Sequence, residues 1–577
     1  MDSRTAAHVL SQIGALLNVK GEQKFKAKAY AGAARSLIAL DTDDLAPFLR
    51  SGELADTPGI GPSTLSVVRE LVETGESSFL NQLREGIPEG LLDLLRVPGL
   101  NAAKVQLIHD TLGVQTLEDL ERVAQNGQLA ELPKFGKKSA EKILRGIEIL
   151  RRNSHLRRFP AAAVEAHLLL ANVVKHPDVV NAEVAGSIRR HNEVVADIDI
   201  VAECSADPAR VAASFARSPG VSESKTGEDR ASVHIRFVDG THLDMHCVTK
   251  ADYAVALWRA TGSAAHVEEI NVFARKRGFE IAGNSLIGKS GDSISVKDEA
   301  AFFGALGLEP IPPEMREGMG EIEAAARREL PNLVTYDDLR GVLHCHSDYS
   351  DGTATIEEMA NAARERGWDY IGISDHSESA FYAGGLKRDK LLRQQEEIDR
   401  LNARVKGFRI LKGIEADILA DGRLDYDGTV LDSCDYVIGS IHSRFSMDGE
   451  AMTKRVLAAL DDPHLTILAH PTGRLLLSRE PYDLDVEAVL EKAAQVGVVV
   501  ELNADPHRLD LDWRYCRQAK ELGVLIEIGP DAHSTAALDN VHFGIGMARK
   551  AWLEAGEILN TRSADDVVGL ARKRRGI

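Results

Sequence analysis

The sequence has few cysteines, no long hydrophobic run and no excess of basic residues. Its five cysteines (Cys204, Cys247, Cys345, Cys434 and Cys516) are scattered without the close spacing of zinc-finger or redox pairs. That pattern excludes a disulfide scaffold and favours reduced thiols in a cytoplasm. No apolar stretch is long enough to cross a bilayer, and the first residues, MDSRTAAHVL, lack the apolar segment of a signal peptide. We therefore expect a cytoplasmic protein with no membrane partner.

The net charge of −19 argues against a general binder of polyanions. One segment is positively charged despite the negative total, because basic residues greatly outnumber acidic residues between Lys134 and Arg158. A solvated helix face would explain such a run, but it follows a glycine turn, which favours contact with phosphate. At 577 residues the chain is too long for a single core, so several domains are expected.

Three segments of the first third repeat one pattern: a short apolar helix, a turn and a second helix. They are Leu54–Val68, Leu94–Ile108 and Leu129–Leu144. The first carries Pro-Gly-x-Gly, whereas Asn101 replaces the closing glycine of the second copy and Lys134 the first glycine of the third. Such turns expose backbone N–H groups at a helix N-terminus, where they can hold a phosphate without reading bases. The repeat predicts sequence-independent DNA binding through Gly59, Gly61, Gly99, Gly136, Lys137 and Lys138.

The middle third mixes strand and helix patterns and carries three acidic residues of interest. Asp197 and Asp199 are two apart in a strand and therefore share a face, and Asp244 lies in a second strand, HLDMHCV. Three carboxylates that meet on a sheet bind two hard cations, typically Mg²⁺, which clamp a triphosphate. The alternative is a set of solvent-facing acids on an edge strand.

Six apolar runs in the C-terminal part each end in His, Asp or Glu. The candidate ligands are His344, His346 and Asp351 after the first run, then His376, Glu415, His442, His470, Asp531 and His533. Helical patterns at Ile356–Arg366, Lys387–Val405 and Val486–Gln495 separate the runs. Strands that alternate with helices form a parallel barrel or sheet, whose carboxyl ends meet at one face. Histidines with ordinary partners at strand ends would explain one run, but the whole set predicts a multinuclear site for Zn²⁺, Mn²⁺ or Fe²⁺.

Together these segments resemble the bacterial family X DNA polymerases fused to a C-terminal PHP (polymerase and histidinol phosphatase) domain. The likeness covers nearly the whole chain and includes YAVALWRATGSAAH at 253–266 and HCHSDYSDGT at the start of the last domain. It implies a multidomain fold: an all-α helix-hairpin-helix region, an α+β nucleotidyltransferase palm with a thumb, and an α/β distorted (β/α)₇ barrel. The implied domains are a small helical domain (1–80), fingers (81–158), palm (159–250), thumb (251–312), linker (313–338) and PHP domain (339–577).

The resemblance also implies how the metal site works. One ion is held by His344, His346, Glu415 and Asp531; Glu415 bridges to a second ion on His442 and His470; Asp351, His376 and His533 hold a third. The implied activity is a Mn²⁺-dependent 3′–5′ exonuclease, with AP-endonuclease activity in some members, acting in DNA repair. The implied partner is gapped, nicked or 3′-ended DNA, with Arg508 as a phosphate contact. A monomer is favoured.

The palm both keeps and departs from the family pattern. The three aspartates remain, as do the family's triphosphate contacts Gly186, Ser187 and Arg190. Four other positions differ: Val195 and Ala196 replace a hydroxyl residue and a glycine, and Ala260 and Val267 replace an aromatic and an asparagine. Each lost hydrogen-bond donor weakens binding of the nucleotide by about 1 kcal/mol or more. We therefore expect Mg²⁺ binding in the palm but weak or absent polymerisation, with dNTP as a poor partner.

Two other functions fit parts of the sequence. The barrel alone would suit a phosphatase of small phosphate monoesters, although the hairpins and palm have no use in such an enzyme. The altered palm would suit a DNA end-binding module with vestigial catalysis, although the full ligand set of the barrel argues against it.

Overall fold

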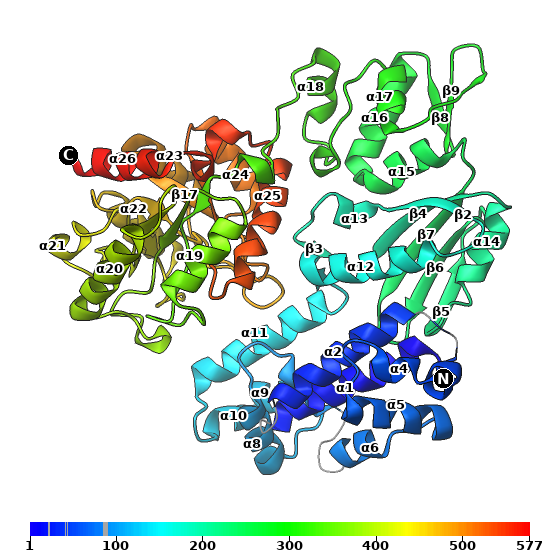
Figure 1. The fold of residues 1–577 in the computed structure, drawn as a ribbon, viewed down its shortest axis with the longest axis horizontal. Helices are drawn as coiled ribbons and strands as arrows, with labels where there is room; N and C mark the ends of the chain where they lie inside the picture. The colour runs from blue at the N-terminus through cyan, green and yellow to red at the C-terminus, as the bar shows by residue number, and fades with distance from the viewer. Residues whose placement is uncertain (21–23, 41, 43, 85–89) are drawn as a thin grey trace.

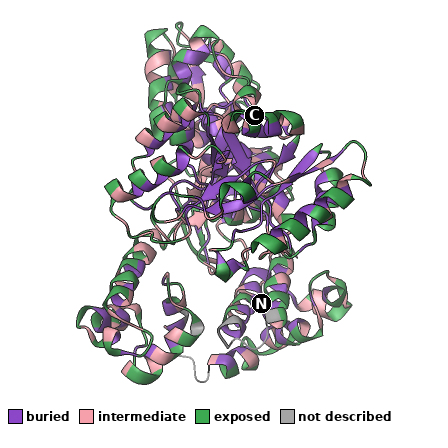
Figure 2. Ribbon diagram, turned by 90° about the vertical axis from the view of Figure 1, so that its left-hand side faces the viewer, coloured by how far each residue is buried: buried purple, intermediate pink, exposed green. Residues whose placement is uncertain are grey.

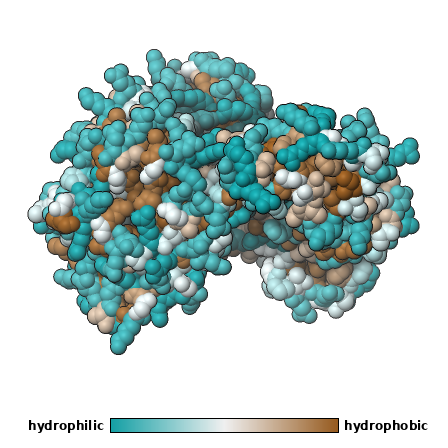
Figure 3. Space-filling model, turned by 90° about the horizontal axis from the view of Figure 1, so that it is seen from above, coloured by the Kyte–Doolittle hydropathy of each residue, from teal (hydrophilic) through white to brown (hydrophobic). Residues whose placement is uncertain are grey.

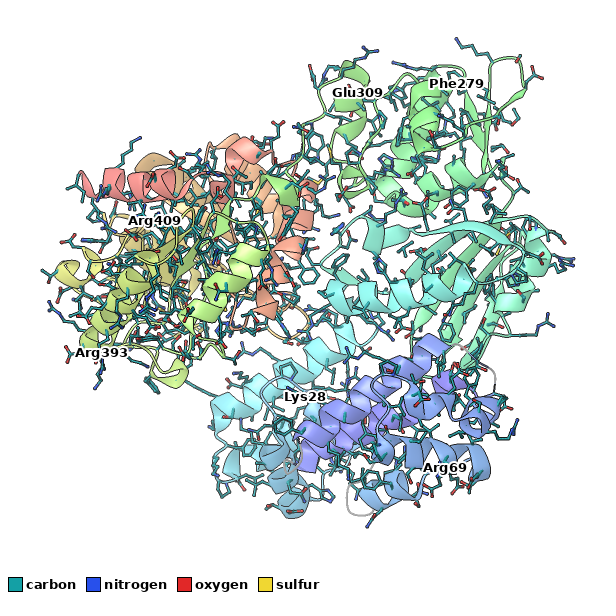
Figure 4. The ribbon with its side chains drawn as sticks, viewed as in Figure 1. Lys28, Arg69, Phe279, Glu309, Arg393 and Arg409 are labelled. Atoms are coloured by element: carbon teal, nitrogen blue, oxygen red, sulfur yellow. The ribbon has the colours of Figure 1, made fainter. Side chains whose placement is uncertain are left out.

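The computed structural model describes residues 1–20, 24–40, 42, 44–84 and 90–577. Figure 1 shows a helical N-terminal region, a body built on an antiparallel-rich sheet, a smaller mixed body above it and a barrel at the C-terminal end. Figure 4 labels Phe279 and Glu309 on the mixed body, at the opposite end from Lys28 and Arg69 on the N-terminal helices. Within the described part of the chain, no helix is long and apolar enough to span a membrane. The face in Figure 3 is mainly hydrophilic.

The N-terminal region is built from short helices. They are α1 (Ser3–Lys20), α2 (Lys24–Leu40), α3 (Ala46–Ser51), α4 (Glu53–Asp56), α5 (Pro62–Thr74), α6 (Ser78–Arg84), α7 (Leu91–Leu95), α8 (Ala102–Leu112), α9 (Leu117–Gln125), α10 (Gln128–Glu131) and α11 (Lys137–Asn153). Apolar residues at helical spacing, such as Leu10, Ile13 and Leu17 on α1, are buried in one shared cluster. This packing stabilises helices too short to persist alone.

The three predicted hairpins lie at α4–α5, α7–α8 and α10–α11. In each turn the residue after proline has a left-handed backbone: Gly59 (φ 89°), Gly99 (φ 92°) and Lys134 (φ 68°). Glycine adopts this conformation at little cost, whereas Lys134 adopts it with a side chain. The second helix of each hairpin then begins after Gly61, Asn101 or Gly136. The structure thus repeats one turn geometry despite the two substitutions.

The sheet of the central body is ordered β2-β4-β7-β6-β5. Its strands are β2 (Val179–Val184), β4 (Ile198–Cys204), β5 (Val221–Thr226), β6 (Ser232–Phe237) and β7 (His242–Val248). Only β4 and β7 are parallel. Alternate residues of β6 (Val233, Ile235 and Phe237) are buried in a core to which α12 (Phe159–Val173) and α14 (Pro208–Phe215) contribute.

The mixed body holds the predicted thumb. It contains α15 (Tyr253–Thr261), α16 (Ala264–Lys276), β8 (Glu280–Ala282), β9 (Ser285–Ile287), β10 (Ser293–Ile294) and α17 (Glu299–Ala305). The segment that we expected to be a linker packs against it: Met315, in the short helical turn η1 (Pro313–Met315), and Ile322, on α18 (Glu321–Arg327), share its core. Inside that core the carboxylate of Glu321 lies 2.7 Å from Nδ1 of His266, and both side chains are fully buried. The connection therefore forms part of the thumb, because its apolar and ionic side chains are buried there.

The C-terminal domain is a closed parallel barrel. Its strands are β11 (Gly341–Val342), β12 (Tyr370–Ile373), β13 (Arg409–Lys412) continuing into β14 (Glu415–Asp417), β15 (Ile438–Ser440), β16 (Ile467–Leu468), β17 (Val499–Asn503) and β18 (Ile526–Gly529). They pair in this order, and bridges at His376–Glu415 and Cys345–Ala532 complete the circle. If β13 and β14 are counted as one strand, the barrel has seven strands, which confirms the expected (β/α)₇ fold. The strands are buried on both faces, as Figure 2 shows in purple.

Helices cover the outside of the barrel. They are α19 (Ile356–Glu365), α20 (Arg388–Asn402), α21 (Gly428–Leu431), α22 (Gly449–Leu460), α23 (Val486–Val496), α24 (Trp513–Glu521), α25 (Val541–Lys550) and α26 (Ala564–Arg575). The last residue of α25 reaches the central body. Nζ of Lys550, which is only 2% exposed, lies 2.8 Å from Oδ1 of Asn192 and also contacts the carboxylate of Glu317. The barrel is thus joined to the palm by a buried polar contact.

Candidate metal centre at the barrel mouth

The nine predicted ligands lie together at one mouth of the barrel. Each follows or begins a strand: His344, His346 and Asp351 come after β11, His376 after β12, Glu415 at the start of β14, His442 after β15, His470 after β16, and Asp531 and His533 after β18. The strand that we expected at the first two histidines is shorter than predicted. β11 ends at Val342, and the Cys345–Ala532 bridge continues the pairing. Backbone hydrogen bonds of Ala532 with His344 and His346 keep the chain beside β18 as far as the second histidine.

The ligand atoms form four overlapping groups. Within each group the candidate atoms lie within 4.8 Å of one another: His346, Asp351, His376 and His533; His344, Glu415 and His470; His344, His346 and Asp531; His376, Glu415 and His442. Among the described residues, no group of this kind lies outside the barrel mouth.

Glu415 lies between two of these groups. Its Oε1 is 3.1 Å from Nε2 of His470 and 3.4 Å from Nε2 of His442. Its Oε2 is 2.8 Å from Nδ1 of His376, 3.6 Å from Nε2 of His344 and 3.7 Å from Nε2 of His346. The two oxygens of one carboxylate therefore face different sets of histidines, as the oxygens of a bridging ligand do.

Several buried ligand atoms have no hydrogen-bond partner in the protein. They are Nε2 of His344, both ring nitrogens of His346, Nδ1 of His376, Oε2 of Glu415 and Nδ1 of His470. Buried polar atoms are normally paired, since leaving one unpaired costs about 1–3 kcal/mol. Imidazoles and carboxylates without thiolates are a donor set for Mn²⁺, Zn²⁺ or Fe²⁺. The orphaned atoms and the donor set fit bound metal ions.

A second layer of carboxylates, which sequence reasoning missed, orients the imidazoles. Nδ1 of His344 contacts Glu501, and Nδ1 of His442 lies 2.8 Å from Oδ1 of Asp417. Such partners fix the ring so that the other nitrogen faces the metal. The signal was present in the sequence: Glu501 is an acid inside the apolar strand VVVELN, and Asp417 lies two residues after Glu415, on the same strand face.

Electrostatics keeps two of the imidazole ligands neutral, whereas nearby carboxylates, against the effect of burial, raise the pKa of His344 and His376 and raise the pKa of His533 to about 9. Burial and nearby His376 lower the pKa of His346 to about 3, and burial with Arg508 lowers the pKa of His470 to about 4. Both imidazoles are therefore neutral at physiological pH, the form that binds metals. Although burial opposes it, the neighbouring imidazoles hold the pKa of Glu415 well below its ordinary value. The carboxylate is consequently ionised.

Backbone strain accompanies two of the ligands. His470 (φ 28°) and Asp531 (φ 48°) have positive φ angles, which residues with a side chain adopt rarely. Strained residues of this kind concentrate at functional sites, where the surrounding structure enforces them.

The ligands surround a cavity of about 290 Å³. Tyr382, Phe445, Arg479 and Arg508 line its remaining wall. Nε of Arg508 lies 3.5 Å from Oδ2 of Asp531, so the predicted phosphate contact is at the cavity. A guanidinium there suits an anionic substrate.

The palm aspartates are close but differently engaged. Asp199 and Asp244 are paired neighbours on β4 and β7. The pKa of Asp197 is raised, mainly by its burial and further by the negative charges of Asp199 and Asp244. However, Oδ1 of Asp244 lies 2.7 Å from Nδ1 of His234, and the three carboxylates are not among the tight ligand groups found in the described residues. Their role as Mg²⁺ ligands stays a prediction.

The predicted triphosphate contacts lie beside these aspartates on α13 (Gly186–Arg189) and just after it. A Cβ on Gly186 (φ 61°) would fall 1.8 Å from Oδ2 of Asp199, so only glycine fits there. Oγ of Ser187 is buried without a partner. Arg190 is occupied, since its Nη1 donates to the carbonyl of Thr261 at 2.7 Å and its Nε to Glu317 at 2.9 Å. Val195 is buried, and Ala196 is exposed.

The predicted DNA contacts lie on the N-terminal hairpins. Gly59, Gly61, Gly99 and Gly136 stand in or directly after the three turns, and Lys137 and Lys138 begin α11 with exposed side chains. Their contact with DNA stays a prediction.

Four segments of the chain match known protein families. They are a PHP domain at residues 343–504, a DNA polymerase beta thumb at 256–317, a helix-hairpin-helix domain at 1–77 and a SAM-like helix-hairpin-helix tandem at 91–148. Among related proteins, the DNA polymerase/3′-5′ exonuclease PolX of Bacillus subtilis is 36% identical over 99% of this chain and 100% of its own length. Probable phosphatases of Caldanaerobacter subterraneus and a Thermoanaerobacter species are 30% and 29% identical over 41% of this chain, covering 93% and 95% of their own lengths.

The fold and the site define a class of protein: helix-hairpin-helix modules and a polymerase-beta-type thumb joined to a PHP barrel with a histidine and carboxylate mouth. The chain belongs to the bacterial family X DNA polymerases that carry a C-terminal PHP domain. The expected family and fold class are thereby confirmed.

Proposed function

We propose that this protein is a DNA repair enzyme whose barrel removes nucleotides from DNA 3′ ends as a 3′–5′ exonuclease. The observation that carries the proposal is Glu415, whose two oxygens face separate sets of histidines at a cavity of about 290 Å³. A multinuclear site of this form suits phosphate-ester hydrolysis. The Bacillus subtilis relative, which spans the whole chain, is named as a polymerase and 3′–5′ exonuclease.

We assign three ions, with Mn²⁺ as the proposed metal. His344, His346, Asp531 and Glu415 would hold the first, Glu415, His442 and His470 the second, and Asp351, His376 and His533 the third. When bound, the ions would polarise phosphoryl oxygens and lower the pKa of a water molecule, which is the chemistry that hydrolysis of a phosphate ester needs.

The chain's own residues supply the rest of the mechanism. Glu415 lies between two sets of histidines, and Glu501 and Asp417 hold the rings of His344 and His442 in place. Arg508 and Arg479 at the cavity attract the phosphates of the DNA. Cleavage at abasic sites, the AP-endonuclease reaction, would use the same groups.

The N-terminal hairpins are proposed to grip the DNA backbone. Their turns direct the N-termini of α5, α8 and α11 outward, and Lys137 and Lys138 add positive charge at the last of them. Contacts with phosphate supply affinity without sequence preference. The partner would therefore be DNA of any sequence with a gap, nick or free 3′ end.

The test is hydrolysis by the full-length protein of 3′-recessed DNA and of para-nitrophenyl phosphate, with Mn²⁺, Zn²⁺, Fe²⁺ or a chelator. We expect Mn²⁺ to give the fastest release of nucleotides from the 3′ end, and chelation to stop it, because the orphaned imidazoles need a metal. Faster turnover of para-nitrophenyl phosphate with little cleavage of DNA would favour the small-molecule phosphatase, the function named for the barrel's shorter relatives. No hydrolysis of either, with DNA still bound, would favour an end-binding module.

Polymerisation is expected to be weak. Buried Val195 offers no hydroxyl to a triphosphate, and Arg190 is already held by Glu317. In a gap-filling assay with Mg²⁺ and dNTPs, we expect slow extension by the unaltered chain, since each missing donor costs about 1 kcal/mol, or about fivefold in affinity for the nucleotide. Replacing Val195 with serine and Ala196 with glycine should accelerate extension. Rapid gap filling by the unaltered chain would contradict this proposal.

A further inference from the structure

Two neighbouring aromatic side chains are exposed at the rim of the metal cavity. Phe381 is 85% exposed and Tyr382 is 61% exposed. Both belong to a short helical turn, η3 (Phe381–Ala383), which follows the strand that delivers His376. Two large aromatic rings that lie next to each other and are exposed to water are typical of a binding surface.

The two rings lead from the metal ligands outward. The ring centre of Tyr382 lies 6.4 Å from that of His376 and 6.2 Å from that of His442, and Tyr382 lines the cavity. The ring centre of Phe381 lies 6.2 Å from that of Tyr382, at an interplanar angle of 76°. Aromatic surface therefore continues from the reaction site to the exterior.

The turn that carries the rings is held in place. A bridge pairs Ser377 with Leu386 at its base, and the N–H of Ala383 donates to the carbonyl of Ala380 at 2.9 Å. A Cβ on Gly385 would fall 2.0 Å from the carbonyl oxygen of Ser377, so the turn closes tightly. Rings presented by an ordered turn lose little conformational entropy when a ligand binds.

The same cavity carries positive charge. Arg479 and Arg508 line it together with Tyr382, and the guanidinium of Arg479 packs 4.4 Å from the ring centre of Phe445. A nucleotide offers both complementary groups, a phosphate for a guanidinium and a base for an aromatic ring. Inside a duplex the faces of each base are covered by its stacked neighbours, so only a terminal or unpaired base can lie on such a ring.

We propose that Phe381 and Tyr382 form a stacking platform for unpaired bases at a DNA 3′ end, while Arg479 and Arg508 face the adjacent phosphates. The inference rests on the proposed nuclease function and narrows its substrate to single-stranded or frayed 3′ ends. Phe381, the more exposed ring, supplies the outer half of the platform, beyond the metal ligands.

The test compares the unaltered protein with Phe381→Ala on two 3′-overhang substrates, one with normal 3′-terminal nucleotides and one with abasic residues in their place. We expect the KM for the normal end to rise about tenfold with kcat unchanged, in line with the worth of one base–aromatic stack, and the KM for the abasic end to stay the same. Phe381→Trp should restore the KM. Tyr515→Ala, which removes an aromatic ring that is 40% exposed on α24, is the matched control and should change neither KM. Equal losses on both ends, or no loss on either, would overturn the platform.

A readout independent of hydrolysis is the fluorescence of 2-aminopurine at the 3′ terminus, measured with a chelator present. Binding to the unaltered protein should quench the fluorescence, and Phe381→Ala should remove most of the quenching. If the protein cleaves DNA but this difference is absent, the platform is wrong and the nuclease function stands. If the difference is present but no metal supports cleavage, the platform stands and the nuclease function is wrong.

Discussion

Replacing Glu415 with glutamine is expected to abolish hydrolysis of DNA and to empty the barrel mouth of most of its metal. The side chain is 1% exposed, and its two oxygens lie 2.8–3.7 Å from nitrogens of five histidines. Glutamine keeps the size but removes the negative charge, and its amide nitrogen cannot ligate a cation. We expect the rate to fall at least about a thousandfold, since the ions stabilise the transition state by several kcal/mol. Metal content by mass spectrometry and release of 3′ nucleotides measure the two effects.

A matched control distinguishes loss of the site from general damage. Glu357→Gln removes one charge from the exposed first turn of α19 and should leave metal content and rate unchanged. DNA affinity should survive in Glu415→Gln, because the proposed backbone contacts lie on the N-terminal hairpins. A Glu415→Gln protein that keeps its metal and its activity would show that the barrel mouth is not the reaction site.

Replacing Lys550 with methionine is expected to destabilise the protein by about 3 kcal/mol, because it breaks a buried ionic contact between the barrel and the palm. The side chain is 2% exposed, and its Nζ lies 2.8 Å from Oδ1 of Asn192 and 3.2 Å from the carbonyl oxygen of Arg190. It also contacts the carboxylate of Glu317, which keeps only Arg190 as a partner in the variant. Methionine fills the space but satisfies none of these acceptors. Urea unfolding followed by tryptophan fluorescence measures the change.

Lys573→Met on the exposed face of α26 is the control and should unfold at the same urea concentration as the unaltered protein. Arg190 and Lys550 both contact Glu317. We therefore expect Lys550→Met also to change the protease sensitivity of the junction between thumb and barrel. An unchanged unfolding midpoint for Lys550→Met would mean that this contact does not hold the two bodies together.

Local periodicity predicted the barrel helices closely. The helix expected at Ile356–Arg366 is α19 (Ile356–Glu365), and the helix expected at Val486–Gln495 is α23 (Val486–Val496). These segments bury one apolar face against the barrel, so the spacing of their residues carries the structural information. The same holds for the three hairpins, where Lys134 takes the left-handed conformation of the glycines in the other copies.

Other features could not be read from the chain. The segment expected to be a linker carries Glu321, whose buried partner is His266 of the thumb, far away in the sequence. Glu501, on β17, supports His344, which follows β11 two strands further around the barrel. Such pairs depend on which surfaces meet after folding, and no local pattern specifies their partners.

The sequence by itself determined the family, the order of domains and the residues that converge at the barrel mouth, because strands alternating with helices deliver their carboxyl ends to one face. Only the tertiary structure decided which side chains contact one another: Glu415 lies between two sets of histidines, Glu501 and Asp417 contact the rings of His344 and His442, and Lys550 joins the barrel to the palm. The reason is physical. Spacing along a chain sets which face a side chain occupies, whereas distances of a few ångström between remote side chains arise only when the whole barrel closes and its neighbours pack against it.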